Sequence, residues 1–206
     1  GERLGRYAII GEPTGLQPIR KHKGVFYVRV GVGGKAGHAS NPALGVNAIE
    51  GMHLVLAALD SWRDTIGERY RDDEFEVPAP TLNFGRITGG DSPNRICAEC
   101  KLDVDVRLLP GMERPAVVAE LRDVVANALD GGPWTFDVGA IGGYADPFGG
   151  PSDAEFSGAV ETLCGCSAKT ALFGTEAPFL AELGLQTLVL GAGDIAVAHQ
   201  PDEYVT

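Results

Sequence analysis

The order of the periodic segments between residues 24 and 143 constrains the fold of this chain most strongly. Alternating apolar and polar residues are typical of half-buried strands, and apolar residues at three- and four-residue steps are typical of amphipathic helices. In chain order these patterns predict a strand at 25–32, a helix at 46–70, strands at 81–87 and 95–107, a helix at 115–129 and a strand at 134–138. This βαββαβ order is typical of a ferredoxin-like unit, in which the helices cover one face of the sheet.

Shorter predicted elements flank that unit on both sides. They are a buried strand at 7–10, helices at 153–163 and 178–183, and a strand at 186–190. We therefore expect an α/β fold with three parts along the chain. An α/β body, formed by residues 1–23 and 145–206, is interrupted by an inserted unit at 24–144.

The chain is acidic, with 17 Lys and Arg against 28 Asp and Glu in 206 residues and a formal net charge of −11. We therefore expect neither nucleic acid nor an anionic membrane as a partner. Apolar runs are broken well before the roughly 20 residues that a membrane helix needs, and no signal peptide opens the sequence, so a cytoplasmic protein is expected. The most acidic part, residues 145–206, suits a site for a cation.

Four cysteines form a C-x-x-C pair, Cys97 and Cys100, and a C-x-C pair, Cys164 and Cys166. One interpretation of this spacing is a four-thiolate zinc site, and the other is a set of buried free thiols. Cys97 and Cys100 fall within the strand predicted at 95–107, where an offset of three residues places their side chains on opposite faces. We therefore expect free thiols.

Several polar residues stand at predicted strand ends or in glycine-flanked loops, where a rigid scaffold presents functional groups. They are Glu12, His38, Glu176 and His199. Taken singly, each of these residues is more often a solvated side chain or an ordinary turn residue than a functional one. His22, in a basic R-K-H-K run, and His53, in the first long helix, are expected to be structural or solvated.

Seven short motifs connect these positions to a known family. In chain order they are G-E-P-T at 11–14, G-H-A-S at 37–40, G-V-N-A-I-E at 45–50, N-R-I-C-A at 94–98, D-V-R-L-L-P-G at 105–111, G-T-E-A-P-F at 174–179 and A-H-Q-P-D-E-Y at 198–204. Together they resemble the acetylornithine deacetylases, a group within the dinuclear zinc (M20-type) peptidase and deacylase family. That family also contains succinyl-diaminopimelate desuccinylase and carboxypeptidase G2. The resemblance covers nearly the whole chain.

This resemblance implies a bilobed metalloenzyme that hydrolyses the N-acetyl amide of N2-acetyl-L-ornithine, a step of arginine biosynthesis. Its catalytic α/β domain would hold two Zn²⁺ or Co²⁺ ions, and its inserted ferredoxin-like domain would form a homodimer. Of the family's metal ligands, two map onto this chain, Glu12 and His199. A carboxylate and an imidazole are both suitable zinc ligands.

The resemblance also implies roles for residues that do not bind metal. His38 would reach across the dimer and stabilise the oxyanion of the partner's reaction. Asn94 and Arg107 would bind the substrate carboxylate, although Arg107 could instead pair with Asp105. Gly174 and Thr175 match a substrate-facing loop. The role of Glu176 stays open between orienting a metal ligand and contacting substrate.

The chain departs from the family pattern at its beginning. The family's His-x-Asp motif, its bridging Asp and its Glu-Glu pair all precede G-E-P-T, and only eleven residues precede Glu12 here. We therefore expect a fragment that lacks the first ~150–170 residues and the last helix, and that is inactive alone. Two alternatives remain. One is a desuccinylase or another N-acyl amino acid amidohydrolase, and the other is a noncatalytic dimerisation or ligand-binding module.

Overall fold

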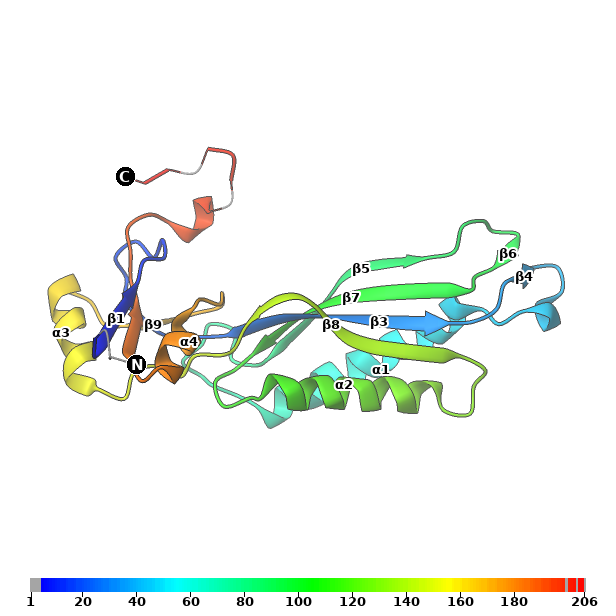
Figure 1. Cartoon of the computed structure of the whole chain (residues 1–206), viewed down its shortest axis with the longest axis horizontal. Helices are drawn as coiled ribbons and strands as arrows, with labels where there is room; N and C mark the ends of the chain where they lie inside the picture. Colours follow the sequence, from blue (N-terminus) through cyan, green and yellow to red (C-terminus); the bar gives the residue numbers. More distant parts are fainter. Residues whose placement is uncertain (1–4, 199, 203, 206) are drawn as a thin grey trace.

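The computed structural model describes residues 5–198, 200–202 and 204–205 as two four-stranded sheets with their helices and a two-stranded sheet of β4 and β6, arranged along an elongated molecule (Figure 1). In chain order the elements are β1 (Tyr7–Ile10), β2 (Ile19–His22), β3 (Gly24–Gly33), β4 (Gly37–His38), η1 (Pro42–Leu44), α1 (Ala48–Arg69), β5 (Thr81–Gly89), β6 (Arg95–Ile96), β7 (Glu99–Leu108), α2 (Arg114–Leu129), β8 (Thr135–Ala145), α3 (Ala154–Cys164), β9 (Lys169–Ala171), α4 (Ala177–Glu182), β10 (Gln186–Val189) and η2 (Ile195–Val197). None of the helices in this described part is long and apolar enough to span a membrane.

The larger sheet has the strand order β5-β7-β3-β8, and every neighbouring pair in it is antiparallel. Helix α1 connects β3 to β5, and α2 connects β7 to β8. This is the predicted βαββαβ order, so the expected ferredoxin-like arrangement and the α/β class are confirmed. Both helices lie on the same side of the sheet (Figure 1).

The main hydrophobic core lies between this sheet and its two helices. Side chains alternate between the two faces of a strand, so every second residue of β3 and β7 points toward the helices. The buried residues of these strands are Phe26, Val28, Val30, Val32, Cys100, Leu102, Val104, Val106 and Leu108. They meet apolar stripes on α1 and α2, of which Met52, Val55, Leu59, Leu121 and Val125 are at most 2% exposed.

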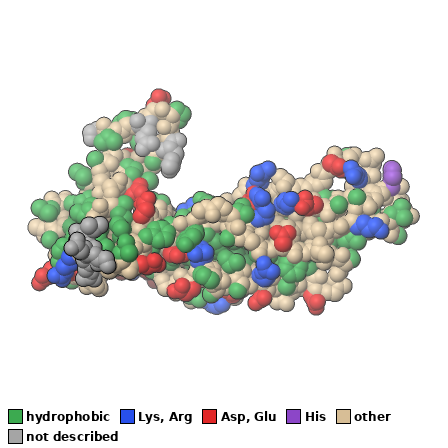
Figure 2. All heavy atoms as spheres, in the orientation of Figure 1, with side chains coloured by type: hydrophobic (Ala, Val, Ile, Leu, Met, Phe, Trp, Pro, Cys, Tyr) green, Lys and Arg blue, Asp and Glu red, His purple; other side chains and the backbone are tan. Residues whose placement is uncertain are grey.

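The opposite face of the larger sheet is polar and is crossed by ion pairs. Arg29 on β3 binds both carboxylate oxygens of Asp103 on β7, at 2.6 and 2.8 Å. Arg107 binds Asp105 two residues away in the same strand, at 2.7 and 2.8 Å. Figure 2 shows basic and acidic side chains interspersed over this part of the molecule. Each charge of these two ion pairs thus has a partner on the face of the sheet that no helix covers.

The smaller sheet has the order β1-β10-β2-β9, in which β1 pairs with β10 and β2 with β9 in parallel. Helices α3 and α4 accompany it. The Asp153 side chain caps α3 by accepting hydrogen bonds from two backbone amides, and Gly165 ends it in the left-handed conformation. The chain passes between the two sheets twice, after β2 and after β8. The proposed domain boundaries at residues 23/24 and 144/145 stay a prediction.

Three sequence-based expectations for the elements need correction. Strands β2, β4 and β9 were not predicted, so His38 lies in a short strand and not in the expected loop, and β8 is 11 residues long although the predicted strand covered only 134–138. The strand predicted at 95–107 is interrupted, because β6 ends at Ile96 and β7 begins at Glu99. Each of these strands is stabilised by pairing with distant segments, which local periodicity does not report.

That interruption also overturns the expected orientation of the two strand cysteines. Cys97 and Cys100 both belong to the main core, with 5% and 1% exposure. Cys97 lies between the two strands, where its thiol contacts the Glu99 carbonyl oxygen at 3.0 Å, so strand alternation does not apply to it. All four cysteines are free, as expected, although Cys164 is only half-buried and Cys166 is exposed.

Candidate functional site

Glu12 directly follows the turn that ends β1, at an edge where two parallel strands finish side by side. The loop after β10 packs against this turn. The Gly15 amide donates to the Gly193 carbonyl oxygen at 2.7 Å, and a Cβ atom at residue 191 would overlap the Glu12 carbonyl oxygen. Glycine is therefore required at 191, and its close approach brings the chain after β10 against the backbone of Glu12.

Glu12 is chemically suited to bind a divalent metal ion through its carboxylate oxygens. The other predicted ligand, His199, lies outside the described residues. Among the residues that the structure describes, no group of three or more His, Cys, Asp or Glu side chains is arranged to hold a metal ion. The described residues thus supply one predicted ligand and do not form a metal site by themselves.

A pocket of about 510 Å³ opens beside the Glu12 turn. Its walls are mainly apolar and come from the turn, from β2 and from the segment around β9. Two carboxylate residues, Glu76 and Asp194, also line it. Glu76 belongs to the segment between α1 and β5, so the pocket combines residues of the smaller sheet with a residue connected to the larger one.

Gly174 and Thr175 lie where the chain passes between the two sheets. A Cβ atom on Gly174 would meet both Val25 and Ala145 at 3.0 Å, so this loop packs tightly on the bases of β3 and β8. Thr175 is only 5% exposed, and its hydroxyl is 2.9 Å from Nε2 of His22. Glu176, the next residue, is exposed at the start of α4 and makes no side-chain capping bond.

Arg107 and Lys23 bring two cations close to the same junction. Arg107 lies opposite Val25 in the β3–β7 register, and its guanidinium binds Asp105. Lys23 is 1% exposed, and its ammonium donates to the Ala79 carbonyl oxygen. Burial, with a smaller contribution from the Arg107 charge, lowers the pKa of Lys23 to about 8.

His38 and Asn94 lie together at the far tip of the larger sheet. His38 pairs with Arg95 in the short β4–β6 ladder, and the Ala39 amide donates to the Asn94 carbonyl oxygen at 3.1 Å. The Asn94 side-chain oxygen accepts a hydrogen bond from Ser92 at 2.6 Å. Both predicted site residues are exposed.

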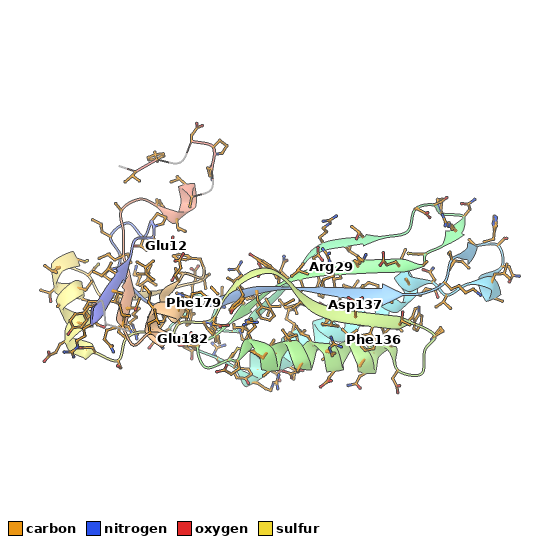
Figure 3. The ribbon with its side chains drawn as sticks, in the orientation of Figure 1. Glu12, Arg29, Phe136, Asp137, Phe179 and Glu182 are labelled. Atoms are coloured by element: carbon orange, nitrogen blue, oxygen red, sulfur yellow. The ribbon has the colours of Figure 1, made fainter. Side chains whose placement is uncertain are left out.

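The predicted site residues therefore occupy three separate places. Glu12 is at the edge of the smaller sheet, Gly174, Thr175 and Arg107 are at the junction, and His38 and Asn94 are at the tip. Figure 1 shows β4 at one end of the elongated molecule, and Figure 3 shows Glu12 toward the other end. One copy of the chain in this conformation does not bring Glu12 and His38 together.

Sequence reasoning missed the part that His22 and Lys23 play at the junction. His22 was expected to be structural or solvated, and it is fully buried and bonded to Thr175. Lys23 was not predicted to be buried, because a lysine in a basic run is usually exposed. One feature of the sequence indicates burial of both residues. They lie directly before Gly24, the first residue of a long, strongly apolar strand.

Comparison with known families identifies part of the chain. Residues 20–133 match the model of the peptidase dimerisation domain of the M20 family. The matched segment contains β3, α1, β5, β7 and α2, which are most of the ferredoxin-like unit, together with His38, Asn94 and Arg107.

Curated relatives resemble the chain over almost its full length. It is 46% identical to an acetylornithine deacetylase from Vibrio parahaemolyticus over 200 residues, which are 97% of this chain and 53% of that protein. A Vibrio cholerae acetylornithine deacetylase is also 46% identical, over 202 residues. The chain thus spans about half the length of the curated relatives that it matches.

Solved structures show a similar fold at low sequence identity. A tripeptidase from Staphylococcus aureus superposes with a TM-score of 0.67 at 18% identity, covering 92% of this chain and 49% of that one. The aminopeptidase PepT from Bacillus cereus superposes with a TM-score of 0.68 at 21% identity, with the same coverage. These likenesses support the α/β architecture.

Proposed function

Because the chain belongs to the M20 peptidase dimerisation domain family, we propose that it is part of a metal-dependent deacetylase that hydrolyses the N-acetyl amide of N2-acetyl-L-ornithine. The observation that carries this proposal is the 46% identity to acetylornithine deacetylases over 97% of the chain. Ornithine and acetate are then the products, and the chain alone is inactive. We place the complete protein in the cytoplasm.

The metal ions belong to this proposal. The complete protein would bind two Zn²⁺ or Co²⁺ ions, with Glu12 and His199 among the ligands, and these ions would polarise the acyl carbonyl and activate a water molecule. What the chain itself contributes is Glu12, whose backbone lies at the strand edge against the loop after β10. The pocket beside it carries Glu76 and Asp194, whose negative charges suit the free ammonium group of the ornithine side chain.

The remaining residues bind and orient the substrate in this proposal. Arg107 and Asn94 hold the substrate carboxylate, and because they lie at opposite ends of the larger sheet, Asn94 comes from the second copy, as His38 does. Arg107 must also exchange Asp105 for the substrate, since both of its forked donors bind Asp105 here. Gly174 and Thr175 form the substrate-facing loop. His38 donates a hydrogen bond to the developing oxyanion.

We place the reaction of each subunit next to His38 of a second copy, in a homodimer formed through the inserted unit. The separation of Glu12 from the β4 tip supports this arrangement, because a single copy leaves the two side chains at distant positions (Figures 1 and 3). The match to a dimerisation domain supports it as well. Light scattering of the complete protein at micromolar concentration is expected to give the mass of a dimer.

The first experiment measures acetate release from N2-acetyl-L-ornithine by the longer protein that contains this chain, loaded with zinc or cobalt. Release of acetate supports the proposal. Preferential cleavage of N-succinyl-diaminopimelate, or of another N-acyl amino acid, would replace the substrate assignment. Absence of hydrolysis with every N-acyl amino acid would instead favour a noncatalytic dimerisation or ligand-binding module.

The second experiment tests the position of His38 by mixing two inactive variants. A His38→Ala subunit retains Glu12, and a Glu12→Gln subunit retains His38, so a mixed dimer contains one complete site if His38 acts across the interface. Random exchange of equal amounts makes about half of the dimers mixed and restores about a quarter of the wild-type activity. Activity that stays at the level of the separate variants would place His38 in the site of its own subunit.

A further inference from the structure

His22 is a buried histidine to which the proposed mechanism gives no task. It is the last residue of β2 and has no exposed surface. Its backbone exchanges two hydrogen bonds with Phe148, at 3.1 and 3.0 Å, and the two rings lie 5.5 Å apart. These contacts fix the imidazole at the junction where the chain passes between the sheets after β2 and after β8.

Both ring nitrogens of His22 have partners, and the partners determine the tautomer. Nδ1 is 2.9 Å from the Lys23 carbonyl oxygen, which only accepts, so Nδ1 carries the proton. Nε2 therefore accepts a hydrogen bond from the Thr175 hydroxyl at 2.9 Å. That hydroxyl in turn accepts from the Ala177 amide at 3.1 Å.

These bonds form a directed chain from the first residue of α4 to the end of β2. Burial lowers the pKa of His22, an effect only partly opposed by the hydrogen bond to the Lys23 carbonyl and by the nearby Glu176 charge, so the ring is neutral at pH 7 and Nε2 is free to accept. The threonine side chain is held inward, while its neighbour Glu176 is exposed. The loop is also packed on β3 and β8 through Gly174, so its position is defined from two sides.

We propose that His22 is a positioning residue: by accepting a hydrogen bond from the Thr175 hydroxyl, it holds the Gly174–Ala177 loop in the conformation that receives the substrate. This inference rests on the proposed function, in which the loop that contains Gly174 and Thr175 faces the substrate, while the Thr175 hydroxyl points inward. His22 itself is buried beneath the loop and does not contact the substrate. His22 acts on the loop through one hydroxyl group. A change in substrate binding can therefore be measured separately from a change in the stability of the fold.

The test uses the longer protein with three variants at the bond and one control. Thr175→Val removes the hydroxyl and keeps the shape, His22→Gln replaces the imidazole acceptor, and Thr175→Ser retains a hydroxyl. His53→Gln, at an exposed histidine of α1, is the control. For each folded variant, kcat and KM are measured with N2-acetyl-L-ornithine, or with whichever N-acyl amino acid the wild type cleaves.

We expect His22→Gln to raise KM about tenfold, the factor that the loss of one buried hydrogen bond supports, and Thr175→Val, which also removes the acceptor of the Ala177 amide, to raise it at least as much. Thr175→Ser is expected to keep most of the wild-type KM, and the double variant Thr175→Val/His22→Gln to be no worse than Thr175→Val alone. If the His22→Gln variant does not fold, the KM of Thr175→Val alone tests the proposal. Lower stability with unchanged KM and kcat in the folded variants would reduce His22 to a purely structural residue and overturn the proposal.

A second measurement separates failure of this inference from failure of the proposed function. Nitrogen NMR of the wild-type protein reports the His22 tautomer without any substrate, and we expect the proton on Nδ1. A proton on Nε2 would overturn the anchoring of Thr175, whatever the enzyme cleaves. A wild type without any hydrolase activity would refute the proposed function, and with it the role of His22 toward substrate, even if the tautomer is as expected.

Discussion

Replacing Lys23 with methionine is predicted to stabilise the fold at neutral pH. Lys23 is almost completely buried, and its ammonium group has a carbonyl oxygen as hydrogen-bond partner and the Phe75 ring 6.0 Å away. No carboxylate of the described residues forms an ion pair with it at this position. Burying a cation without a counter-charge is costly, and the Arg107 charge adds repulsion.

The size and sign of the effect follow from the pKa of Lys23, which is about 8 in the fold against 10.5 for an ordinary lysine. Each pKa unit corresponds to roughly 1.4 kcal/mol, so the protonated amine destabilises the fold by about 3 kcal/mol at pH 7. Methionine removes this cost but also removes the hydrogen bond to Ala79, which is worth roughly 1–2 kcal/mol. The net gain expected from Lys23→Met is therefore about 1–2 kcal/mol in the free energy of unfolding.

The gain must disappear as the pH rises. Between pH 8 and 10.5 the unfolded chain still binds the Lys23 proton and the folded chain has released it, so the free energy of unfolding of the wild type rises with pH. The Lys23→Met variant lacks this rise. Its advantage over the wild type is thus greatest below pH 8 and is lost through this window.

Urea denaturation followed by tryptophan fluorescence, at pH values from 7 to 10, measures this difference. Lys35→Met, at an exposed lysine, is the matched control for removing one surface lysine charge. A Lys23→Met variant that is less stable than the wild type by the same amount at every pH would refute the reasoning. It would show that the fold accommodates the charged ammonium group without cost.

Two further substitutions test the packing of the larger unit. Leu59→Ala removes a fully buried side chain of α1 and should lower the free energy of unfolding by about 2–5 kcal/mol in urea denaturation, whereas Leu54→Ala, at a 39% exposed position of the same helix, should change it little. Gly34→Ala places a methyl group against the Val46 carbonyl oxygen and should cost about 1–3 kcal/mol. Gly139→Ala, with no atom within 4 Å of the added methyl, is its control, and equal losses for both glycines would contradict the predicted clash.

The sequence predicted the larger unit well because its elements carry their own patterns. Every second residue of β3 from Phe26 to Val32 is buried, and the apolar stripe of α1 continues for the whole helix. Such periodicity depends on neighbouring residues alone. The order of these elements then restricts the possible sheet topologies. Strands that follow one another in the chain tend to pair, and a connection that crosses over a neighbouring strand usually contains a helix.

The smaller sheet was less predictable because its strands depend on remote partners. In β2 the two central residues, Arg20 and Lys21, form ion pairs with Glu74 and Asp72, about fifty positions later in the chain. Locally, the four residues I-R-K-H resemble a charged loop. The inward orientation of His22 likewise results from its contacts with Phe148 and Thr175.

The site residues stay a prediction, and the sequence does not give their arrangement. The motifs select Glu12, Thr175 and His38, but nothing in their spacing states that these residues lie in three separate places. The ion pair of Arg107 with Asp105 was foreseen as an alternative, because two residues apart on a strand share one face. His199 remains a prediction outside the described residues.

The two passages between the sheets hold the β4 tip, which carries His38, away from the Glu12 edge. They are joined by the reciprocal bonds of His22 and Phe148, and a Cβ atom on Gly24 would approach Pro147 to 2.7 Å. Two close, bonded connections resist bending more than one flexible linker would. The β4 tip is therefore held away from the Glu12 edge by the rigid length of β3, and closing that gap within one copy would require breaking these contacts. In the proposed homodimer, a second copy would supply His38 without that cost.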